Sequence, residues 1–166
     1  MSSISLKDVD VFIFDFDGVL TNNKVFIDSN GIESIICSRS DGLAFDVLNK
    51  LKKQSFILST ETNKVVEMRA KKLNIKVHYG IEDKLKGLNQ LVDEYQLTKS
   101  RIFYVGNDLN DFFVMQECGY TACPSDSHPK IKALSNYVCT SKGGEGVVRE
   151  ILEEMFEVDF LKILYK

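Results

Sequence analysis

The 166-residue sequence lacks several features that would assign it to a specialised class of protein. No uncharged apolar run approaches the roughly 18–20 residues of a membrane span, so we expect no membrane association. Lys and Arg total 21 against 24 Asp and Glu, and the net charge of −3 argues against a nucleic-acid partner. The first residues show neither the basic nor the apolar part of an export signal, and we therefore expect a cytoplasmic protein.

Cysteine is present but is not arranged for cross-linking or for zinc. None of the four cysteines forms a C-x-x-C pair, and only two histidines are available to complete a zinc site. We therefore expect reduced, buried thiols rather than a disulfide scaffold or a zinc site. With 44% hydrophobic residues the chain can form a real core, which excludes collagen-like and disordered classes.

Short apolar runs alternate with helical patterns along the chain. Strand-like runs cover residues 9–16, 56–58, 77–79 and 102–105, with short edge strands expected at 120–122 and 137–139. Helical spacing of apolar residues covers 43–51, 64–73, 85–95, 111–118 and 147–156. An Asn-Gly step predicts a β-hairpin at about 24–37. The order predicts one α/β domain over 1–166, with a mostly parallel sheet flanked by helices and a tail and helix at about 142–166.

Two acids follow the first predicted strand, in the sequence Asp15-Phe16-Asp17-Gly18-Val19-Leu20-Thr21. Ligands of parallel α/β sheets bind outside the carboxyl ends of the strands. A single Asp there is explained as the cap of a turn with Gly18. Two carboxylates one residue apart repel each other unless a cation offsets their charge, so the pair favours a metal site.

Three further polar groups follow or adjoin strands. They are Ser59-Thr60-Glu61, Lys84 at the start of a helix, and Gly106-Asn107-Asp108-Leu109-Asn110-Asp111. Each alone has a structural explanation: a helix cap for Ser59, a solvated charge for Lys84, and capping by one acid of the last group. Together they present the carboxylate, amide and hydroxyl oxygens that suit Mg²⁺ and a phosphate.

The set predicts phosphoryl transfer to a carboxylate. Asp15 would attack phosphorus and form an aspartyl-phosphate, and Asp17 would protonate the leaving oxygen and then activate water. Ser59 and Lys84 would hold the phosphate oxygens. The expected Mg²⁺ ligands are Asp15, Asp17, Asn107, Asp108 and Asp111.

These motifs resemble the four motifs of the haloacid dehalogenase (HAD) superfamily of Mg²⁺-dependent phosphatases. D-F-D-G-V-L-T looks like the first motif, Ser59 the second, Lys84 the third and G-N-D-L-N-D the fourth. Nearly the whole chain is similar to one branch, the small capless phosphatases of 3-deoxy-2-keto sugar acid biosynthesis. The further matching segments are S-D-G-L-A at 40–44, R-A-K-K-L at 69–73, I-E-D-K-L at 81–85, Pro124, H-P at 128–129 and K-G-G-E-G-V-V-R-E at 142–150.

The resemblance implies a Rossmann-like sheet and a ring-shaped homotetramer with shared active sites. In that branch the hairpin, here Val25 to Cys37, packs between subunits, and the glycine-rich tail reaches a neighbour's active site. The segment between Ser59 and Lys84 holds one helix and one strand, which leaves no room for a cap domain. Another subunit is then the natural means to exclude water. In a monomer, the tail would instead be a flexible solvated loop.

Two substrates of this branch fit the chain. The octulosonate 8-phosphate phosphatases usually carry an Arg after the second motif, whereas this chain has Glu61 there and Lys72 on the next helix. A Glu–Lys pair resembles the nonulosonate 9-phosphate type, which we predict, with octulosonate 8-phosphate as the alternative. The alternative is that the two residues have no role in substrate binding, and that Glu61 is an exposed residue at a helix start and Lys72 a surface residue. The expected substrate-binding residues are Thr60, Glu61, Arg69, Lys72, Asn110, Gly143, Gly144 and Arg149.

One position departs from the HAD pattern, because Asn107 stands where the first acid of the fourth motif is usual. An amide oxygen is a hard ligand without charge, so metal affinity should fall. A non-catalytic oligomerisation module is therefore the second functional class, although Asp15, Asp17, Ser59 and Lys84 are all present. A signalling receiver domain is a third class, which the D-x-D after the first strand argues against.

Overall fold

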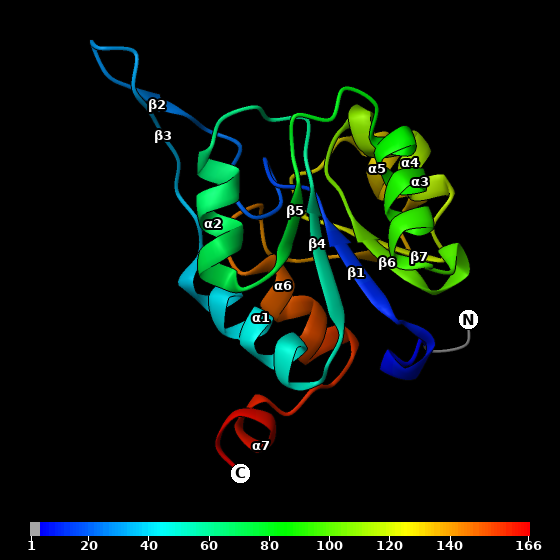
Figure 1. Ribbon diagram of the computed structural model, residues 1–166. Coiled ribbons are helices and arrows are strands. Elements are labelled where there is room, and N and C mark those ends of the chain that lie inside the picture. Colours follow the sequence, from blue (N-terminus) through cyan, green and yellow to red (C-terminus); the bar gives the residue numbers. More distant parts are fainter. Residues whose placement is uncertain (1–3) are drawn as a thin grey trace.

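A six-stranded parallel sheet forms the centre of the computed structural model, which describes residues 4–166 (Figure 1). The strand order is β5-β4-β1-β6-β7-β8, so the first strand lies in the middle. The strands are β1 (Val11–Phe14), β4 (Gln54–Leu58), β5 (Lys76–His78), β6 (Ile102–Val105), β7 (Tyr120–Cys123) and β8 (Tyr137–Val138). All five neighbouring pairs are parallel, which confirms the predicted α/β class.

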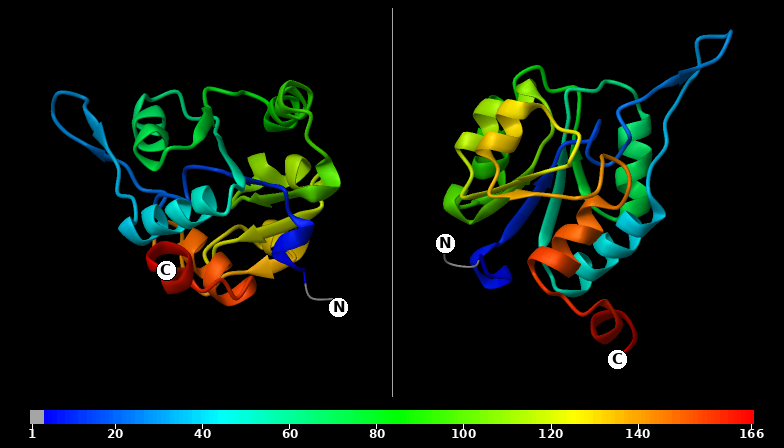
Figure 2. Two further views of the ribbon diagram at one scale, coloured as in Figure 1. Left: turned by 60° about the horizontal axis from the view of Figure 1, so that its bottom comes forward. Right: turned by 180° about the vertical axis from the view of Figure 1, so that it is seen from behind.

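Helices cover both faces of this sheet (Figure 2). Phe12 and Phe14 face a core formed with α1 (Arg39–Lys50), α2 (Val65–Leu73), α6 (Val147–Glu150) and α7 (Phe160–Tyr165). Val11 and Ile13 face the opposite core, formed with α3 (Lys84–Tyr95), α4 (Phe112–Gln116) and α5 (Pro129–Leu134). Successive side chains of a strand point to opposite faces, so a strand covered on both sides is apolar throughout. Burial of each such side chain stabilises the fold by about 1.5–3 kcal/mol.

A two-stranded antiparallel hairpin projects from the body of the molecule (Figure 1). It consists of β2 (Phe26–Ile27) and β3 (Glu33–Ser34). Asp28 Oδ1 accepts hydrogen bonds from the backbone N–H of Asn30 and of Ile32, at 2.9 and 2.8 Å, which closes the turn. The hairpin lies where the Asn-Gly step predicts it, with shorter strands.

Other boundaries differ from the sequence prediction for local reasons. The strand expected over 9–16 ends at Phe14, because Asp15 already belongs to the loop that follows. β7 is not an edge strand, since β6 and β8 flank it. The C-terminal helical pattern continues from α6 into a π-helical turn at Ile151–Met155.

Two short helices, α5 and α7, escaped the sequence analysis. Each has six residues, too few to repeat a helical pattern of apolar side chains. The His128 side chain accepts the Lys130 N–H at the start of α5, and Asp159 accepts the Lys162 N–H at the start of α7. Among the described helices, none combines the length and the apolar character needed to cross a bilayer.

Candidate active site

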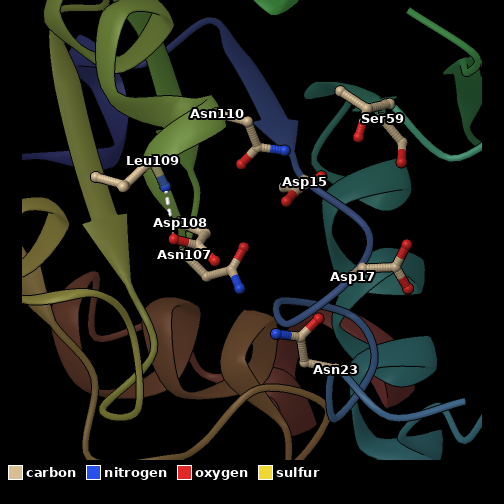
Figure 3. Close-up of a pocket in the computed structure, with 9 residues that line it drawn as sticks. Asp15, Asp17, Asn23, Ser59, Asn107, Asp108, Leu109 and Asn110 are labelled. Atoms are coloured by element: carbon tan, nitrogen blue, oxygen red, sulfur yellow. Dashed lines mark hydrogen bonds between the residues drawn. The ribbon is translucent and has the colours of Figure 1, made fainter. Parts of the chain in front are cut away.

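Three adjacent strands deliver polar side chains to one edge of the sheet. In the register of β1, β4 and β6, Phe14 pairs with Ile57 and with Val105, so these strands end nearly level. The residues that follow line a pocket of about 370 Å³ (Figure 3). The lining residues are Asp15, Asp17, Asn23, Ser59, Thr60, Asn107, Asp108, Leu109 and Asn110.

Asp15 lines the pocket, and one of its two carboxylate oxygens is fixed by hydrogen bonds. Its Oδ1 accepts the backbone N–H of Phe16 at 2.7 Å and lies 2.7 Å from Lys84 Nζ. Within residues 4–166, no hydrogen bond engages Oδ2. Its own backbone N–H donates to Val105 O at 2.9 Å, which ties the carboxylate to the end of β6. The arrangement suits a nucleophile held in one orientation.

Lys84 is buried between two carboxylates. Only 2% of the residue is exposed, and its Nζ lies 2.7 Å from Asp15 Oδ1 and 2.6 Å from Asp111 Oδ1. Asp83 caps the same helix by accepting the N–H of Leu85 at 2.9 Å, and this fixes the first turn of α3 from which Lys84 extends. Lys84 is therefore not a solvated surface charge.

Burial and neighbouring charges shift the pKa values of Asp15 and Lys84. Burial, together with the charge of Asp111, raises the pKa of Asp15 to about 7 in spite of the opposing effect of Lys84. Burial lowers the pKa of Lys84 but the two carboxylates raise it more, so the ammonium keeps its proton. One ammonium and two carboxylates leave an excess of negative charge, and a cation at the pocket would favour the ionised form of Asp15.

Asp111 lies behind the pocket and is not among the lining residues. Its Oδ1 accepts from Lys84 Nζ at 2.6 Å and from Tyr104 Oη at 2.9 Å. Its Oδ2 accepts the backbone N–H of Asn107 at 2.9 Å and of Asp108 at 3.4 Å. Because protein donors occupy both oxygens, this placement departs from the expectation that Asp111 ligates the metal.

Two glycines allow these close approaches. A Cβ atom on Gly106 would lie 2.6 Å from Asp111 Cγ, so only glycine lets the carboxylate fold under the turn. A Cβ atom on Gly18 would lie 1.9 Å from Asn107 Nδ2, and Gly18 also has the left-handed φ of +84°. The two glycines therefore fix how Asp111 and Asn107 are placed.

The donor set fits a Mg²⁺ ion. Asn107 Oδ1 is buried without a hydrogen-bond partner, beside the carboxylates of Asp15 and Asp108 in the pocket lining. Across residues 4–166, no three His, Cys, Asp or Glu side chains form a ready-made metal cage. Mg²⁺ does not need one, because it is usually held by one or two carboxylates together with waters and substrate phosphate.

Asp17 is placed differently from the other acids. Its carboxylate points away from Asn107 and Asp108 in Figure 3, and Thr21 Oγ1 donates to Asp17 Oδ1 at 3.3 Å. Burial and then the charge of Glu61 raise its pKa. A carboxyl group that holds its proton more firmly suits an acid and base better than a metal ligand.

Ser59 combines a structural position with a place in the pocket. Its backbone N–H donates to His78 O at 2.9 Å, and its Oγ accepts the N–H of Glu61 at 3.1 Å.

The Glu61 carboxylate turns back to its own loop, where Oε1 accepts the N–H of Thr62 and of Asn63, both at 2.7 Å. Glu61 does not line the pocket, unlike Thr60 and Asn110.

The cationic side chains expected at the substrate lie outside the pocket lining. Arg69 Nη2 donates to Ser38 O at 2.7 Å, and Arg149 forms an ion pair with Glu153 at 2.9 Å. Lys72 is exposed on α2. None of these three residues lines the pocket of the single chain.

The glycine-rich tail packs on its own chain. Gly144 N donates to Val19 O at 2.9 Å, and a Cβ atom on Gly143 would lie 2.2 Å from Gly18 O. Gly143 N also donates to Asp126 Oδ1 at 3.0 Å. Within the single chain, these close backbone contacts hold Gly143 and Gly144 under the loop after β1, and contact of the tail with a neighbour's site stays a prediction.

Asn23 is a pocket residue that the sequence analysis missed. It has a left-handed φ of 59°, which Asn tolerates better than most residues, and it faces the pocket from the side of Asp17 (Figure 3). The only indication in the sequence is that Asn23 is the second of two asparagines, Asn22 and Asn23, that directly follow the first motif.

Comparisons with known proteins identify the family of this chain and several of its relatives. The family model described as haloacid dehalogenase-like hydrolase matches residues 43–151. The 3-deoxy-D-manno-octulosonate 8-phosphate phosphatase KdsC of Yersinia pestis is 29% identical over 147 residues, which are 88% of this chain and 79% of that protein.

Two crystal structures share the fold over most of both chains. A protein of Streptomyces avermitilis assigned to the HAD hydrolases is 38% identical, with a TM-score of 0.89 over 92% of this chain and 87% of that one. The Moraxella catarrhalis 3-deoxy-D-manno-octulosonate 8-phosphate phosphatase, in complex with magnesium, phosphate and KDO, is 30% identical, with a TM-score of 0.85 over 95% and 88%. The chain described here belongs to the haloacid dehalogenase-like hydrolases.

Proposed function

We propose that this chain is a Mg²⁺-dependent phosphatase that hydrolyses the terminal phosphate ester of 3-deoxy-octulosonate 8-phosphate. The observation that carries the proposal is the position of Asp15, which lines the pocket with its Oδ1 held by Lys84 and by the Phe16 N–H and with no hydrogen bond to its Oδ2 among residues 4–166. The relatives named as phosphatases of this sugar acid, and the magnesium in one of their structures, support the substrate and the cofactor.

The reaction would proceed in two transfers of the phosphoryl group. Asp15 Oδ2 attacks phosphorus, the ester bond to the sugar oxygen breaks, and Asp17 gives its proton to the departing alkoxide. Asp17, now a carboxylate, then takes a proton from water as the water oxygen attacks the aspartyl-phosphate. The bond between phosphorus and Asp15 breaks, phosphate leaves, and both carboxyl groups return to their first state.

Asp15, Asn107 and Asp108 are the residues that would hold Mg²⁺. Bound there, the ion supplies positive charge that offsets repulsion between an anionic nucleophile and an anionic phosphate. Lys84 adds a buried ammonium at the same place, and the Ser59 hydroxyl donates to a phosphate oxygen. Asn107 contributes no charge, so we expect weaker metal binding than an Asp there would give.

The eight-carbon acid replaces the nine-carbon acid as the preferred substrate. The preference for a nonulosonate 9-phosphate rested on Glu61, whose carboxylate is engaged by the N–H groups of Thr62 and Asn63 outside the pocket lining. The octulosonate phosphatases among the relatives cover most of this chain. The first observation removes the support for the nine-carbon acid, and the relatives favour 3-deoxy-octulosonate 8-phosphate.

A homotetramer with shared active sites would complete the substrate site. No Lys or Arg is among the residues that line the pocket, although the substrate carries a carboxylate. The projecting hairpin exposes large apolar side chains, with Phe26 69% exposed, and such patches are typical of interfaces. We therefore propose that hairpins pack between subunits, and that cationic groups from a neighbour meet the substrate carboxylate.

A cytoplasmic location stays a prediction.

The experiment compares phosphate release by the purified chain with Mg²⁺ from three esters. These are 3-deoxy-octulosonate 8-phosphate, a nonulosonate 9-phosphate and p-nitrophenyl phosphate, with Asp15→Asn as the control for a contaminating phosphatase. We expect the highest kcat/KM for the eight-carbon acid and none above background for the variant. Preference for the nine-carbon acid would overturn the substrate, and no hydrolysis of any ester would favour a non-catalytic module.

A further inference from the structure

We infer that Tyr104 is a positioning residue of this site, which acts through Asp111 on Lys84. The inference rests on the proposed phosphatase function and extends it to a residue that touches neither substrate nor metal. Tyr104 lies on β6, and none of its surface is exposed. Its hydroxyl donates to Asp111 Oδ1 at 2.9 Å, on the oxygen that also meets Lys84.

Three side chains from three different elements form one buried hydrogen-bonded cluster. Tyr104 comes from β6, Lys84 from the first turn of α3, and Asp111 itself from the 3₁₀ turn Leu109–Asp111 that precedes α4. Lys84 Nζ is then shared between Asp111 and Asp15, at 2.6 and 2.7 Å. The hydroxyl of Tyr104 is thus linked to the nucleophile by three consecutive hydrogen-bonded contacts, all of them buried.

The phenol hydroxyl has two physical effects on Lys84. First, it fixes the orientation of the Asp111 carboxylate, which together with Asp15 sets the position of the ammonium group. Second, it stabilises the negative charge of Asp111, so that Asp111 attracts the ammonium group of Lys84 less strongly. Without the hydroxyl, Asp111 would hold Lys84 more tightly and at a different angle, and less of its charge would act on Asp15 and the transferring phosphoryl group.

This role differs from simple core packing. The ring of Tyr104 packs in the apolar cluster with Ile13, Phe56 and Leu88, and a phenylalanine would fill the same space. If the residue served packing alone, an apolar ring would be sufficient there. Among residues 4–166 the hydroxyl has a single hydrogen bond, and that bond goes to the carboxylate next to Lys84.

The test is the variant Tyr104→Phe, which keeps the ring and removes only the hydroxyl. With p-nitrophenyl phosphate and saturating Mg²⁺, we expect kcat to fall about tenfold with KM changed less than about twofold, the size of one hydrogen-bond effect. p-Nitrophenyl phosphate separates this result from the identity of the sugar. If the wild-type chain hydrolyses no ester, the proposed function fails; if wild type is active and Tyr104→Phe keeps its kcat, only the role of Tyr104 fails.

A double-mutant cycle distinguishes action through Asp111 from a separate structural effect. In an Asp111→Asn background, the further change Tyr104→Phe should lower kcat less than about twofold, because the link is already broken. A full additional tenfold loss would overturn the inference. Should Asp111→Asn fail to fold, the comparison of kcat between wild type and Tyr104→Phe decides alone.

Tyr137→Phe is the matched control. Tyr137, on β8, also donates from its hydroxyl to a carboxylate, Glu150 Oε1 at 3.2 Å, but it is not among the residues that line the pocket. We expect this variant to lose some thermal stability and to keep its kcat. An equal loss of kcat in both tyrosine variants would show a general structural effect and overturn the assignment.

Discussion

The ammonium group of Lys84 lies 2.7 Å from Asp15 Oδ1, with both residues almost fully buried. A lysine at this distance fixes one carboxylate oxygen and leaves the other available. It also brings positive charge to a position where a phosphate would bring negative charge. In the proposed function, this arrangement would both orient the nucleophile and help to bind the phosphate of the substrate.

Lys84→Met should remove activity and destabilise the fold. The change leaves Asp15 and Asp111 buried without their shared cation, for which the expected cost is about 3–5 kcal/mol. We expect kcat to fall at least about 100-fold, as for loss of one electrostatic contact in a transition state. Urea unfolding and steady-state kinetics check both effects. The neighbouring Lys86→Met is the control, and retention of more than a tenth of the activity by Lys84→Met would contradict the role.

Asn107→Asp should strengthen metal binding. It adds a negative charge where Asn107 Oδ1 is buried and has no partner, so the apparent Mg²⁺ dissociation constant should fall about tenfold, or about 1.4 kcal/mol. Isothermal titration with Mg²⁺ measures this without reference to activity. Asn30→Asp makes the same change in charge at the exposed hairpin turn and should have no effect. Equal affinities in wild type and Asn107→Asp would mean that this side chain is not a ligand.

Asp41 should make stability depend on pH in acid solution. Its Oδ1 accepts the N–H of Val148 and of Arg149, at 2.8 and 3.2 Å, while burial raises its pKa to about 6 from 3.8. Because the pKa is higher in the folded state, its contribution to stability is full below pH 4 and is lost as the pH rises to about 6 and above. The shift corresponds to about 3 kcal/mol.

Urea titrations between pH 4 and 7 check this expectation. Asp41→Asn keeps an acceptor oxygen but cannot ionise, so this variant should lose less stability than wild type as the pH rises through that window. Asp46→Asn, at an exposed position of the same helix, is the control and should follow wild type. Identical pH profiles for wild type and Asp41→Asn would remove Asp41 as the cause.

Phe26→Ser should weaken assembly without unfolding the subunit. Phe26 is exposed on the hairpin, where its removal costs the isolated chain almost nothing but would cost an interface much of its apolar contact. Sedimentation velocity should show a tetramer for wild type and smaller species for the variant. Met68→Ser, on the exposed face of α2, is the control. A wild-type chain that sediments as a monomer at micromolar concentration would refute the shared site.

The sequence predicts which residues meet at the site better than it predicts the contacts among their side chains. Apolar runs and their spacing indicate parallel strands, and parallel strands end at one edge, so Asp15, Ser59 and Asn107 were expected to meet. Where Asp111 points depends instead on Gly106, which leaves room for its carboxylate, and on the Tyr104 hydroxyl. These are contacts between side chains, and no periodic pattern encodes them.

The position of the glycine-rich tail was also beyond the sequence. Two glycines in a polar segment are equally compatible with a mobile loop and with close backbone packing. The contacts of Gly143 and Gly144 with the loop after β1 decide between the two. Glu61 is a similar case. From the sequence, its carboxylate is equally able to bind a sugar or to accept hydrogen bonds from its own backbone. In the structure it accepts the N–H groups of Thr62 and Asn63.

The most direct measurement is identification of the residue that carries phosphate during turnover. The chain is mixed with Mg²⁺ and substrate, quenched in acid within milliseconds and reduced with borohydride, which converts an aspartyl-phosphate into homoserine. Peptide mass spectrometry then locates the reduced residue. The account predicts homoserine at position 15 in the wild-type chain. Turnover with an unmodified Asp15, or with the label on another carboxylate, would contradict it.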